Sequence, residues 1–244
     1  MELAVYEHEA AVEETHWWFV GRRKLFSREL SRLGLSEHSR ILDIGTGTGA
    51  NLRLLRQIGM HRVVGLDESD TAIRFCAARG LGAVQQGDIR RLPFEDGTFD
   101  LVLATDVIEH VEEDAQAIAE IRRVLAPGGY ALVTVPAFAS LWGLQDDQSH
   151  HRRRYRRAEF RDLLLRAGFD IRRSYYFNYL LFPAIWGARR IIKWLKPDLE
   201  SENQVNTPLI NRILGWIFSL DVRTAPLVRP PFGVSILAIC RRPA

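Results

Sequence analysis

The segment from Arg40 to Asn51, RILDIGTGTGAN, constrains the fold more than any other part of this chain. Mostly apolar residues form a short strand, alternating glycines form a tight turn, and a helix begins directly afterwards. Gly45, Gly47 and Gly49 let the backbone turn sharply and approach a ligand closely. The helix that follows directs its free N–H groups towards a polar group at the turn. This arrangement predicts a nucleoside-binding α/β fold.

An acidic residue follows the glycine turn at the spacing that nucleotide-binding folds use. The segment VVGLDES is a second apolar strand, and it ends at Asp67. An acidic side chain about 20 residues beyond the turn hydrogen-bonds the ribose hydroxyls in a Rossmann-type site. Asp43 precedes the turn, where it either contacts the ligand or orients the turn from beneath.

Strands and helices alternate along most of the chain. Continuous apolar strands separated by helices indicate a parallel sheet that is covered on both faces. The run APGG at 126–129 is a proline and glycine stop for the helix before it. The pattern predicts strands at 40–44, 62–67, 83–87, 98–104, 130–136, 169–177 and 233–240, and helices at 49–58, 69–79, 113–125 and 157–167.

Both ends of the chain depart from this alternation. Residues 1–33 are predicted to be a helical leader containing THWWFVGRRKLF, and residues 137–149 are predicted to be a loop. Apolar helices are expected at 180–196, which is also basic, and at 208–220, where Thr207 and Pro208 form an N-cap and first-turn pair. The block at 178–231 is too long for a plain loop, so it is predicted to be a helical insertion between two final strands.

The composition excludes several classes of protein. Hydrophobic residues make up 47% of the 244 positions, which excludes a disordered chain, and the net charge of +3 does not by itself indicate nucleic acid. The acidic N-terminus is not a secretory signal, and no apolar run is long enough to cross a bilayer. Cys76 and Cys240 are expected to be buried free thiols in a reducing compartment. A cytoplasmic protein is expected, or one peripheral to the inner membrane face.

Five motifs together resemble those of the class I S-adenosylmethionine-dependent methyltransferases, of the type 11-like kind. In chain order they are DIGTGTG, the strand ending at Asp67, GDIRRLPFEDGTFDLV, TDVIEHV and RRVLAPGGYALVTVP. The resemblance covers about residues 38–177. It implies a Rossmann-like, doubly wound sheet of seven strands with an antiparallel last strand. It also implies one methyltransferase domain, made of a leader or lid (1–34), a cofactor-binding core (35–177), a helical insertion or cap (178–231) and the final strand (232–241).

The resemblance implies S-adenosylmethionine as cofactor and assigns residues to it. The glycine turn would approach the methionine and ribose, Asp67 would bind the ribose hydroxyls, and Asp88 would hold the adenine amino group. A structural turn and a helix cap are the alternatives for these residues. The full set of expected cofactor contacts is Asp43, Gly45, Gly47, Gly49, Asp67, Glu68, Asp88, Ile89, Thr105, Asp106, Trp17 and Arg22.

The leader run HWWF, followed by two arginines, has two interpretations. It is either a helix packed on the core or a lid over the site. In a lid, Trp17 and Arg22 would contact the cofactor, Arg22 through the methionine carboxylate, and Trp18 would contact the substrate. This leader and HHRRRY are similar to a bacterial subgroup linked to cell-surface glycan, lipid or natural-product pathways.

The run HHRRRYRR at 150–157 is the candidate acceptor site. A solvated basic face is one interpretation, whereas Arg153, Arg154 and Tyr155 binding an anionic substrate is the other. His151 or His150 is the candidate catalytic base for a hydroxyl acceptor. Glu109 and His110 precede a helix, and for His110 a structural or adenine-side role is favoured over catalysis. No metal site is predicted.

Methyl transfer to an oxygen, carbon or nitrogen of a small-molecule or lipid- or glycan-linked acceptor is the leading function, and the acceptor is expected to be anionic with an apolar tail. A nicotinamide dehydrogenase, an RNA-modifying methyltransferase and a non-catalytic cofactor-binding module are the alternatives. Nucleic acid is not expected as a partner, because TDVIEH stands where the Asn-Pro-Pro-aromatic tetrapeptide of base amino methylation would lie. The late helices either cap the substrate or contact a membrane surface, and the oligomeric state is left open.

Overall fold

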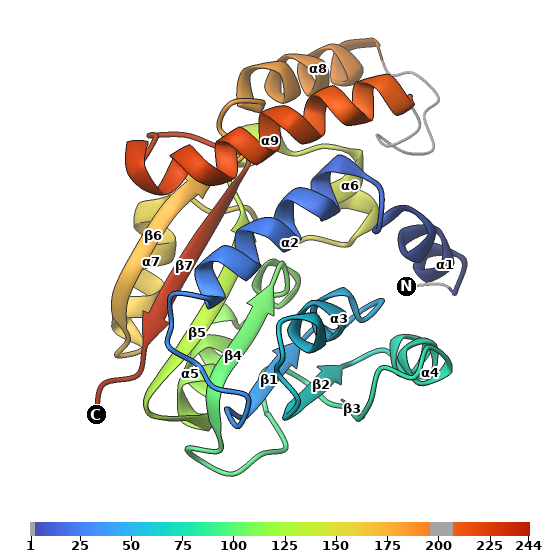
Figure 1. Cartoon of the computed structure of the whole chain (residues 1–244). Coiled ribbons are helices and arrows are strands. Elements are labelled where there is room, and N and C mark those ends of the chain that lie inside the picture. Colours follow the sequence, from blue (N-terminus) through green and yellow to red (C-terminus); the bar gives the residue numbers. More distant parts are fainter. Residues whose placement is uncertain (1–2, 196–206) are drawn as a thin grey trace.

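A seven-stranded sheet forms the centre of the computed structural model, which describes residues 3–195 and 207–244 (Figure 1). The strand order is β3-β2-β1-β4-β5-β7-β6, and β7 runs antiparallel to both of its neighbours. This confirms the predicted α/β fold with an antiparallel last strand. The strands are β1 (Ile41–Ile44), β2 (Val63–Asp67), β3 (Val84–Gln86), β4 (Phe99–Thr105), β5 (Leu125–Pro136), β6 (Asp170–Phe177) and β7 (Ser235–Arg241).

Helices cover both faces of the sheet and bury alternate residues of each central strand. Leu101 and Leu103 of β4 pack with α2 (Trp17–Leu30), α3 (Ala50–Gln57) and α9 (Pro208–Val228). Val102 and Ala104 pack on the other face, with α5 (Asp114–Val124) and α7 (Arg157–Arg166). Successive side chains of a strand point to opposite faces, so a strand covered on both sides is apolar at nearly every position.

The first part of the chain forms two helices. α1 (Leu3–Val12) contacts α4 (Asp70–Ala78), whereas α2 lies against α9. The chain turns between them, and the His16 ring accepts the Trp18 backbone N–H at 3.3 Å as the N-cap of α2. Residues 1 and 2 of the predicted leader lie outside the described residues.

Two sequence predictions for the segments flanking β5 were wrong. β5 begins at Leu125, so the APGG run lies inside a bulged strand, where Leu125 pairs with Phe99 before the register shifts. The predicted loop at 137–149 contains a 3₁₀ turn, η2 (Ala139–Leu141), and a short helix, α6 (Leu144–Gln148). The Asp146 side chain accepts the Gly143 N–H at 2.7 Å and thereby starts α6.

α9 continues eight residues beyond its predicted end at 220, although Pro226 lies inside it. A proline cannot donate to the carbonyl four residues earlier, which here is Val222. Arg28 of α2 donates to that carbonyl instead, at 2.7 Å. The helix therefore continues because a neighbouring helix satisfies the carbonyl group that proline leaves without a partner.

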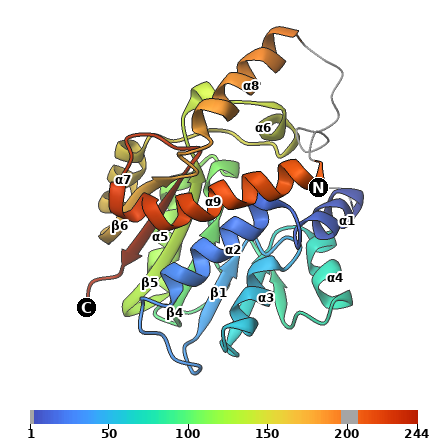
Figure 2. The same cartoon turned by 45° about the horizontal axis from the view of Figure 1, so that its top comes forward.

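The block between β6 and β7 contains α8 (Phe182–Leu195) and α9. Asp221 anchors α9 to the end of β6, because its buried carboxylate accepts the backbone N–H groups of Asn178, Tyr179 and Leu180. Figure 2 shows α9 lying along α2 while α8 extends away from the body of the protein. No helix within 3–195 or 207–244 is long and apolar enough to cross a membrane. Residue 196 of the first predicted late helix lies outside these ranges.

Candidate functional site

The glycine turn lies at the carboxyl end of β1, and its three glycines all have left-handed backbone angles. The φ values are 71° at Gly45, 54° at Gly47 and 83° at Gly49. A Cβ atom at Gly45 would lie 2.3 Å from a Val107 methyl group, whereas one at Gly47 would meet only open space beyond a carbonyl at 3.9 Å. Gly45 is therefore required for packing, and Gly47 leaves room for a ligand.

Asp67 holds this turn from the end of β2. Its carboxylate accepts the backbone N–H groups of Gly47 and Ser69, both at 2.9 Å. The structure thus brings together the turn and the acidic residue that the sequence predicts to act together. Glu68 follows Asp67 and is exposed.

Asp43 lies beneath the turn and is fully buried. Asn51, on the first turn of α3, donates from its side-chain amide to the Asp43 carboxylate at 2.8 Å and to the Thr105 hydroxyl at 3.0 Å. The other Asp43 oxygen has no hydrogen-bond partner among the described residues. Burial, reinforced by the charge of Asp67, raises the pKa of Asp43 to about 7.

Asp106, at the end of β4, pairs with Arg22 of the leader. The two charged groups are 2.6 Å apart, and the Thr134 hydroxyl donates to the second Asp106 oxygen at 3.1 Å. Arg22 also lies over the Trp18 and Phe26 rings, 5.7 and 5.3 Å from their centroids. Two expected cofactor contacts, Arg22 and Asp106, are therefore paired with each other in this structure.

The predicted lid tryptophans pack against α9. The Trp18 ring stacks on Phe218 with centroids 5.4 Å apart and lies near Phe177, while Trp17 makes an edge contact with Phe218 at 5.6 Å. Both tryptophans remain partly exposed. The structure shows the packing role of these rings, and the proposed contacts with cofactor and substrate stay predictions.

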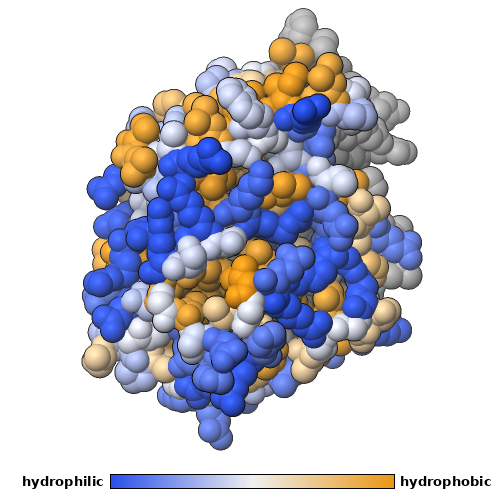
Figure 3. All heavy atoms as spheres, viewed as in Figure 1, coloured by the Kyte–Doolittle hydropathy of each residue, from blue (hydrophilic) through white to orange (hydrophobic). Residues whose placement is uncertain are grey.

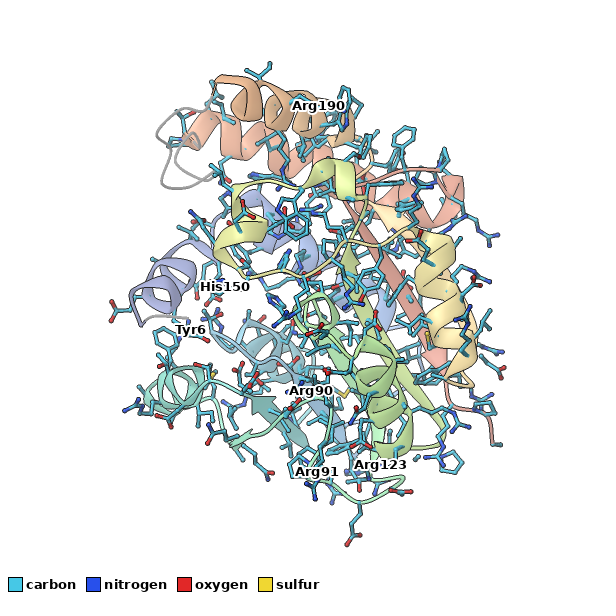
Figure 4. The ribbon with its side chains drawn as sticks, turned by 180° about the vertical axis from the view of Figure 1, so that it is seen from behind. Tyr6, Arg90, Arg91, Arg123, His150 and Arg190 are labelled. Carbon is cyan, nitrogen blue, oxygen red and sulfur yellow. The ribbon has the colours of Figure 1, made fainter. Side chains whose placement is uncertain are left out.

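Asp88 and Ile89 lie near the end of β3. Asp88 accepts hydrogen bonds from the Arg90 guanidinium at 2.7 and 2.9 Å, and these bonds hold the pKa of Asp88 below its usual range. Arg90, labelled in Figure 4, also pairs with Glu113 at 2.9 Å. Ile89 is buried. The adenine contacts assigned to this pair stay predictions.

A cluster of histidines and acids lies close to Asp106. The His151 Nδ1 atom is 2.7 Å from the buried Asp146 carboxylate, which also binds the Arg154 guanidinium at 2.7 and 3.0 Å. Burial raises the pKa of Asp146, but these hydrogen bonds outweigh it and leave that pKa well below its usual range. The His110 ring meets His151 edge to face at 4.7 Å, and burial together with His151 lowers the pKa of His110 to about 4.

Glu109 faces this pair of histidines from η1 (Ile108–His110). Its side chain is fully buried, and its Oε1 atom is 3.9 Å from the His151 Nε2 atom. Neither carboxylate oxygen hydrogen-bonds another described residue. Burial, reinforced by the charge of Asp106, raises the pKa of Glu109 well above its ordinary value.

The remaining residues of the basic run fix its position in the fold. Arg153 pairs with Asp114 at 3.1 Å, and the Tyr155 hydroxyl donates to the same carboxylate at 2.9 Å. His150 is exposed, with a left-handed backbone angle, on the segment between α6 and α7 (Figure 4). Arg153, Arg154 and Tyr155 thus have protein partners, and their contact with a substrate stays a prediction.

Residues 42–133, which contain the turn, Asp67 and Asp106, match the family model described as a methyltransferase domain. A probable S-adenosylmethionine-dependent methyltransferase from Mycolicibacterium smegmatis is 30% identical over 161 residues, which are 65% of this chain and 61% of that protein. This chain carries a class I S-adenosylmethionine-dependent methyltransferase domain. S-adenosylmethionine is therefore its cofactor, and the open space at Gly47 with Asp67 beside it fits that ligand.

Two further proteins are similar to this chain. The sterol 24-C-methyltransferase erg6 of Schizosaccharomyces pombe is 37% identical over 105 residues, 40% of this chain and 28% of that protein. The fold is shared with a chain of a solved complex between the Haloferax volcanii Trm112 methyltransferase activator and a methyltransferase. The TM-score is 0.66 at 23% sequence identity, and the match covers 99% of this chain and 95% of that chain. This chain spans less than two thirds of the length of the curated relatives it matches.

The sequence interpretation missed the buried acid that joins the leader to the glycine turn. Glu13 is 1% exposed; its carboxylate accepts the Thr48 hydroxyl at 2.5 Å and pairs with Arg53 and with Arg79, the latter at 3.0 Å. It also missed Asn51 and Asp146. Asn51 could have been found from its place on the first turn of the helix that follows the glycines, whereas no local pattern marks Glu13 or Asp146.

Proposed function

We propose that this protein methylates a hydroxyl group of an amphiphilic, lipid-linked acceptor, with S-adenosylmethionine as the methyl donor. The observation that carries the proposal is the arrangement of residues and helices at the carboxyl ends of the parallel strands. The glycine turn follows β1, and the helices α6 and α8 and the start of α9 lie beyond the carboxyl ends of the parallel strands (Figure 1). Asp146 is on α6 and pairs with His151. Ligands bind at these strand ends in open α/β sheets.

The chain supplies cofactor binding through the turn and the acids around it. Gly47 leaves space on the ligand side, and Asp67 fixes the turn in place through the Gly47 N–H. S-adenosylmethionine brings an activated methyl group on a sulfonium that is already a good leaving group. The protein therefore contributes mainly by holding donor and acceptor in line.

His151 is the candidate base for the acceptor proton. Asp146 lies at hydrogen-bonding distance from Nδ1, which places the proton of a neutral imidazole on that atom and leaves the Nε2 lone pair free. A hydroxyl has a high pKa, so its methylation benefits from a base within hydrogen-bonding reach. His150, the second candidate, is exposed.

The late helices support an acceptor with an apolar tail and an anionic group. Trp186 and Ile191 on α8 and Ile213 and Trp216 on α9 are exposed to between 39% and 70%. Figure 3 shows hydrophobic side chains gathered over these helices. A hollow of about 210 Å³ between η2 and α8 is lined by Ala139, Ser140, Trp142, Arg189 and Arg190. Arginines in such a hollow suit a phosphate or carboxylate.

The relatives support the same class of acceptor. Proteins named as sterol methyltransferases and as phthiotriol/phenolphthiotriol dimycocerosates methyltransferases share 31–37% identity with parts of this chain. These names describe lipid acceptors of other proteins. Together with the apolar late helices, they favour a lipid over a small water-soluble acceptor here.

Incubation with isotopically labelled S-adenosylmethionine tests the proposal. Purified protein is mixed with a lipid-soluble or a water-soluble cell extract, and mass spectrometry identifies the labelled product. We expect a methyl ether in the lipid fraction and its loss in Asp67→Ala, with Asp70→Ala at the exposed start of α4 as the matched control. Labelled product only in the water-soluble fraction contradicts a lipid acceptor. Absence of S-adenosylmethionine binding by calorimetry contradicts the methyl transfer itself.

A further inference from the structure

Glu109, His110 and His151 form a group of potential metal ligands. One carboxylate oxygen and two imidazole nitrogens, one from each residue, all lie within 4.8 Å of one another. The first two residues belong to η1 and the third follows α6, so the fold brings together groups that are 41 positions apart in the sequence. Two imidazoles and one carboxylate are a donor set for divalent first-row transition metals.

The Glu109 carboxylate lacks the partners that a buried acid normally has. It is fully buried, and neither oxygen hydrogen-bonds another described residue. A buried carboxylate without partners is unfavourable, whereas coordination to a cation compensates for its burial. The Nε2 atom of His151 is 3.9 Å from the Oε1 atom of Glu109, which leaves a position for an ion between the two groups.

Asp146 orients His151 as the outer-shell acid of a metal site does. Metal-binding histidines commonly donate their second ring N–H to a carboxylate, which fixes the ring and leaves the other nitrogen for the ion. The His151 Nδ1 atom is 2.7 Å from Asp146, so Nε2 faces Glu109. Asp146 is itself held by two hydrogen bonds from Arg154 and by the Gly143 N–H.

The arginines near the cluster leave it available to a cation, because each is paired with another acid. Arg154 binds Asp146 at 2.7 Å, and Arg22 binds Asp106 at 2.6 Å. The Arg189 guanidinium is also near Asp146, with 3.8 Å between its Nη1 atom and the Asp146 Oδ2 atom. Glu109 is thus the acidic group of the cluster that no arginine within the described ranges binds directly.

We propose that Glu109, His110 and His151 bind one divalent first-row transition-metal ion, such as Zn²⁺. Ion binding replaces one of the hydrogen bonds between the His110 ring and the backbone of Asp106 and Ser149. Three protein ligands leave coordination positions open for water or for an acceptor oxygen. In the metal-bound state the His151 Nε2 lone pair would bind the ion, and the ion would lower the pKa of a bound hydroxyl so that its proton is released to water. The resulting alkoxide would take the methyl group as the bond from methyl to sulfonium sulfur breaks, leaving S-adenosylhomocysteine. This use of the ion rests on the proposed function, whereas the binding of the ion does not.

Titration with Co²⁺ tests the site. The tag-free chain of residues 1–244 is first treated with a chelator to remove bound metal and is then titrated with Co²⁺. We expect visible absorption bands of protein-bound Co²⁺ that saturate at one ion per chain and disappear when Zn²⁺ is added. Glu109→Gln and His151→Ala each remove one ligand, so each should weaken binding at least tenfold. His38→Ala is the control, because His38 is exposed and its Nε2 atom lies 3.7 Å from the exposed Glu37 carboxylate. Thermal unfolding establishes that each variant is folded.

Two results would overturn the site: no stoichiometric Co²⁺ binding to the wild-type protein, or unchanged binding by Glu109→Gln. Calorimetry with S-adenosylmethionine on the metal-free protein separates this proposal from the proposed function. If the metal-free protein binds the cofactor and neither Co²⁺ nor Zn²⁺ binds, the metal site alone is wrong. If Co²⁺ binds as expected and no methylated product forms, the proposed function alone fails.

Discussion

At the scale of single residues, buried carboxyl groups hold together the segments near the carboxyl ends of the parallel strands. Asp146 and Asp221 are surrounded by donors, the first by two side chains and a backbone N–H and the second by three backbone N–H groups. Asp43 and Glu109 are buried equally deeply, yet both have oxygens without a hydrogen-bond partner in the described part of the chain. Unsatisfied polar groups of this kind are costly in a fold and concentrate at functional sites.

Asp43 should make the stability of the apo protein depend on pH. Its pKa is raised to about 7 in the folded state, so the folded chain keeps a proton that the unfolded chain releases near pH 4. The stability due to this group is therefore greatest below about pH 4 and falls as the pH rises to about 7. Asp43→Asn keeps an acceptor for Asn51 and removes the ionisation. Its melting temperature relative to wild type should rise between about pH 5 and pH 8.

Melting curves without added cofactor check this expectation. Asp70→Asn, at the exposed start of α4, is the control. Parallel pH profiles of the wild-type protein and Asp43→Asn would show that Asp43 does not titrate in this range.

Alanine substitutions at Gly45 and Gly47 should have different effects: the first should mainly lower the stability of the fold, and the second should mainly lower cofactor affinity. Alanine at either position must adopt a left-handed backbone, which costs about 1–2 kcal/mol. At Gly45 the new methyl group also lies 2.3 Å from Val107, so the total loss of unfolding free energy should reach roughly 2–4 kcal/mol. Gly47→Ala should stay folded and lose at least tenfold in S-adenosylmethionine affinity. Urea unfolding and calorimetry measure the two effects, and equal affinity in Gly47→Ala and wild type would contradict the turn as the binding site.

At the scale of elements, the site depends on contacts between segments that are distant in the sequence. Glu13, between α1 and α2, reaches Thr48 in the glycine turn and the arginines of α3 and the α4 C-cap. α2 in turn contacts α9 through the stacked Trp18 and Phe218 rings and through the bond from Arg28 to Val222. The leader therefore links the glycine turn to the late helices.

Glu13→Gln should weaken this link. The amide can still accept the Thr48 hydroxyl, but it leaves Arg53 and Arg79 without a buried counter-charge, at a cost of about 2 kcal/mol. Because Thr48 belongs to the turn, cofactor affinity should fall several-fold as well. Glu14→Gln is the matched control, since Glu14 is 69% exposed and pairs with Arg53 at the surface. Equal unfolding free energies of the two variants would contradict a structural role for Glu13.

The sequence predicts elements better than it predicts contacts between them. All seven strands were located, and the central ones are the clearest, because a strand covered on both faces is a continuous apolar run such as ILDI or LVLA. The end of α9 was missed because Arg28, which satisfies the carbonyl opposite Pro226, is almost 200 residues away. For the same reason the pairing of Arg22 with Asp106, and of His151 with Glu109, could not be predicted. Asp146 is only five positions before His151, but no local sequence pattern marks it as a partner.

At the scale of the whole molecule, the apolar face of the late helices is the largest departure from an ordinary protein surface. Leu209, Ile213, Trp216 and Leu220 recur at helical spacing along α9, and all are at least 41% exposed. Arg212 and Arg223 on the same helix are also exposed, and the protein carries a net charge of +3. An apolar face flanked by basic residues is typical of helices that lie on an anionic bilayer surface.

Replacement of this face should abolish binding to membranes without changing the fold. We expect the wild-type protein to co-sediment with vesicles of phosphatidylcholine and phosphatidylglycerol, and to bind them less as salt is raised, because salt screens the basic residues. Ile213→Glu with Trp216→Glu places two acids on residues that are 50% and 70% exposed, so bound protein should fall at least tenfold. Leu165→Glu, on α7 and 49% exposed, is the control and should bind as wild type does. Equal binding by all three proteins, or none by the wild type, would contradict a membrane-facing surface and leave the apolar helices as a cap for the acceptor alone.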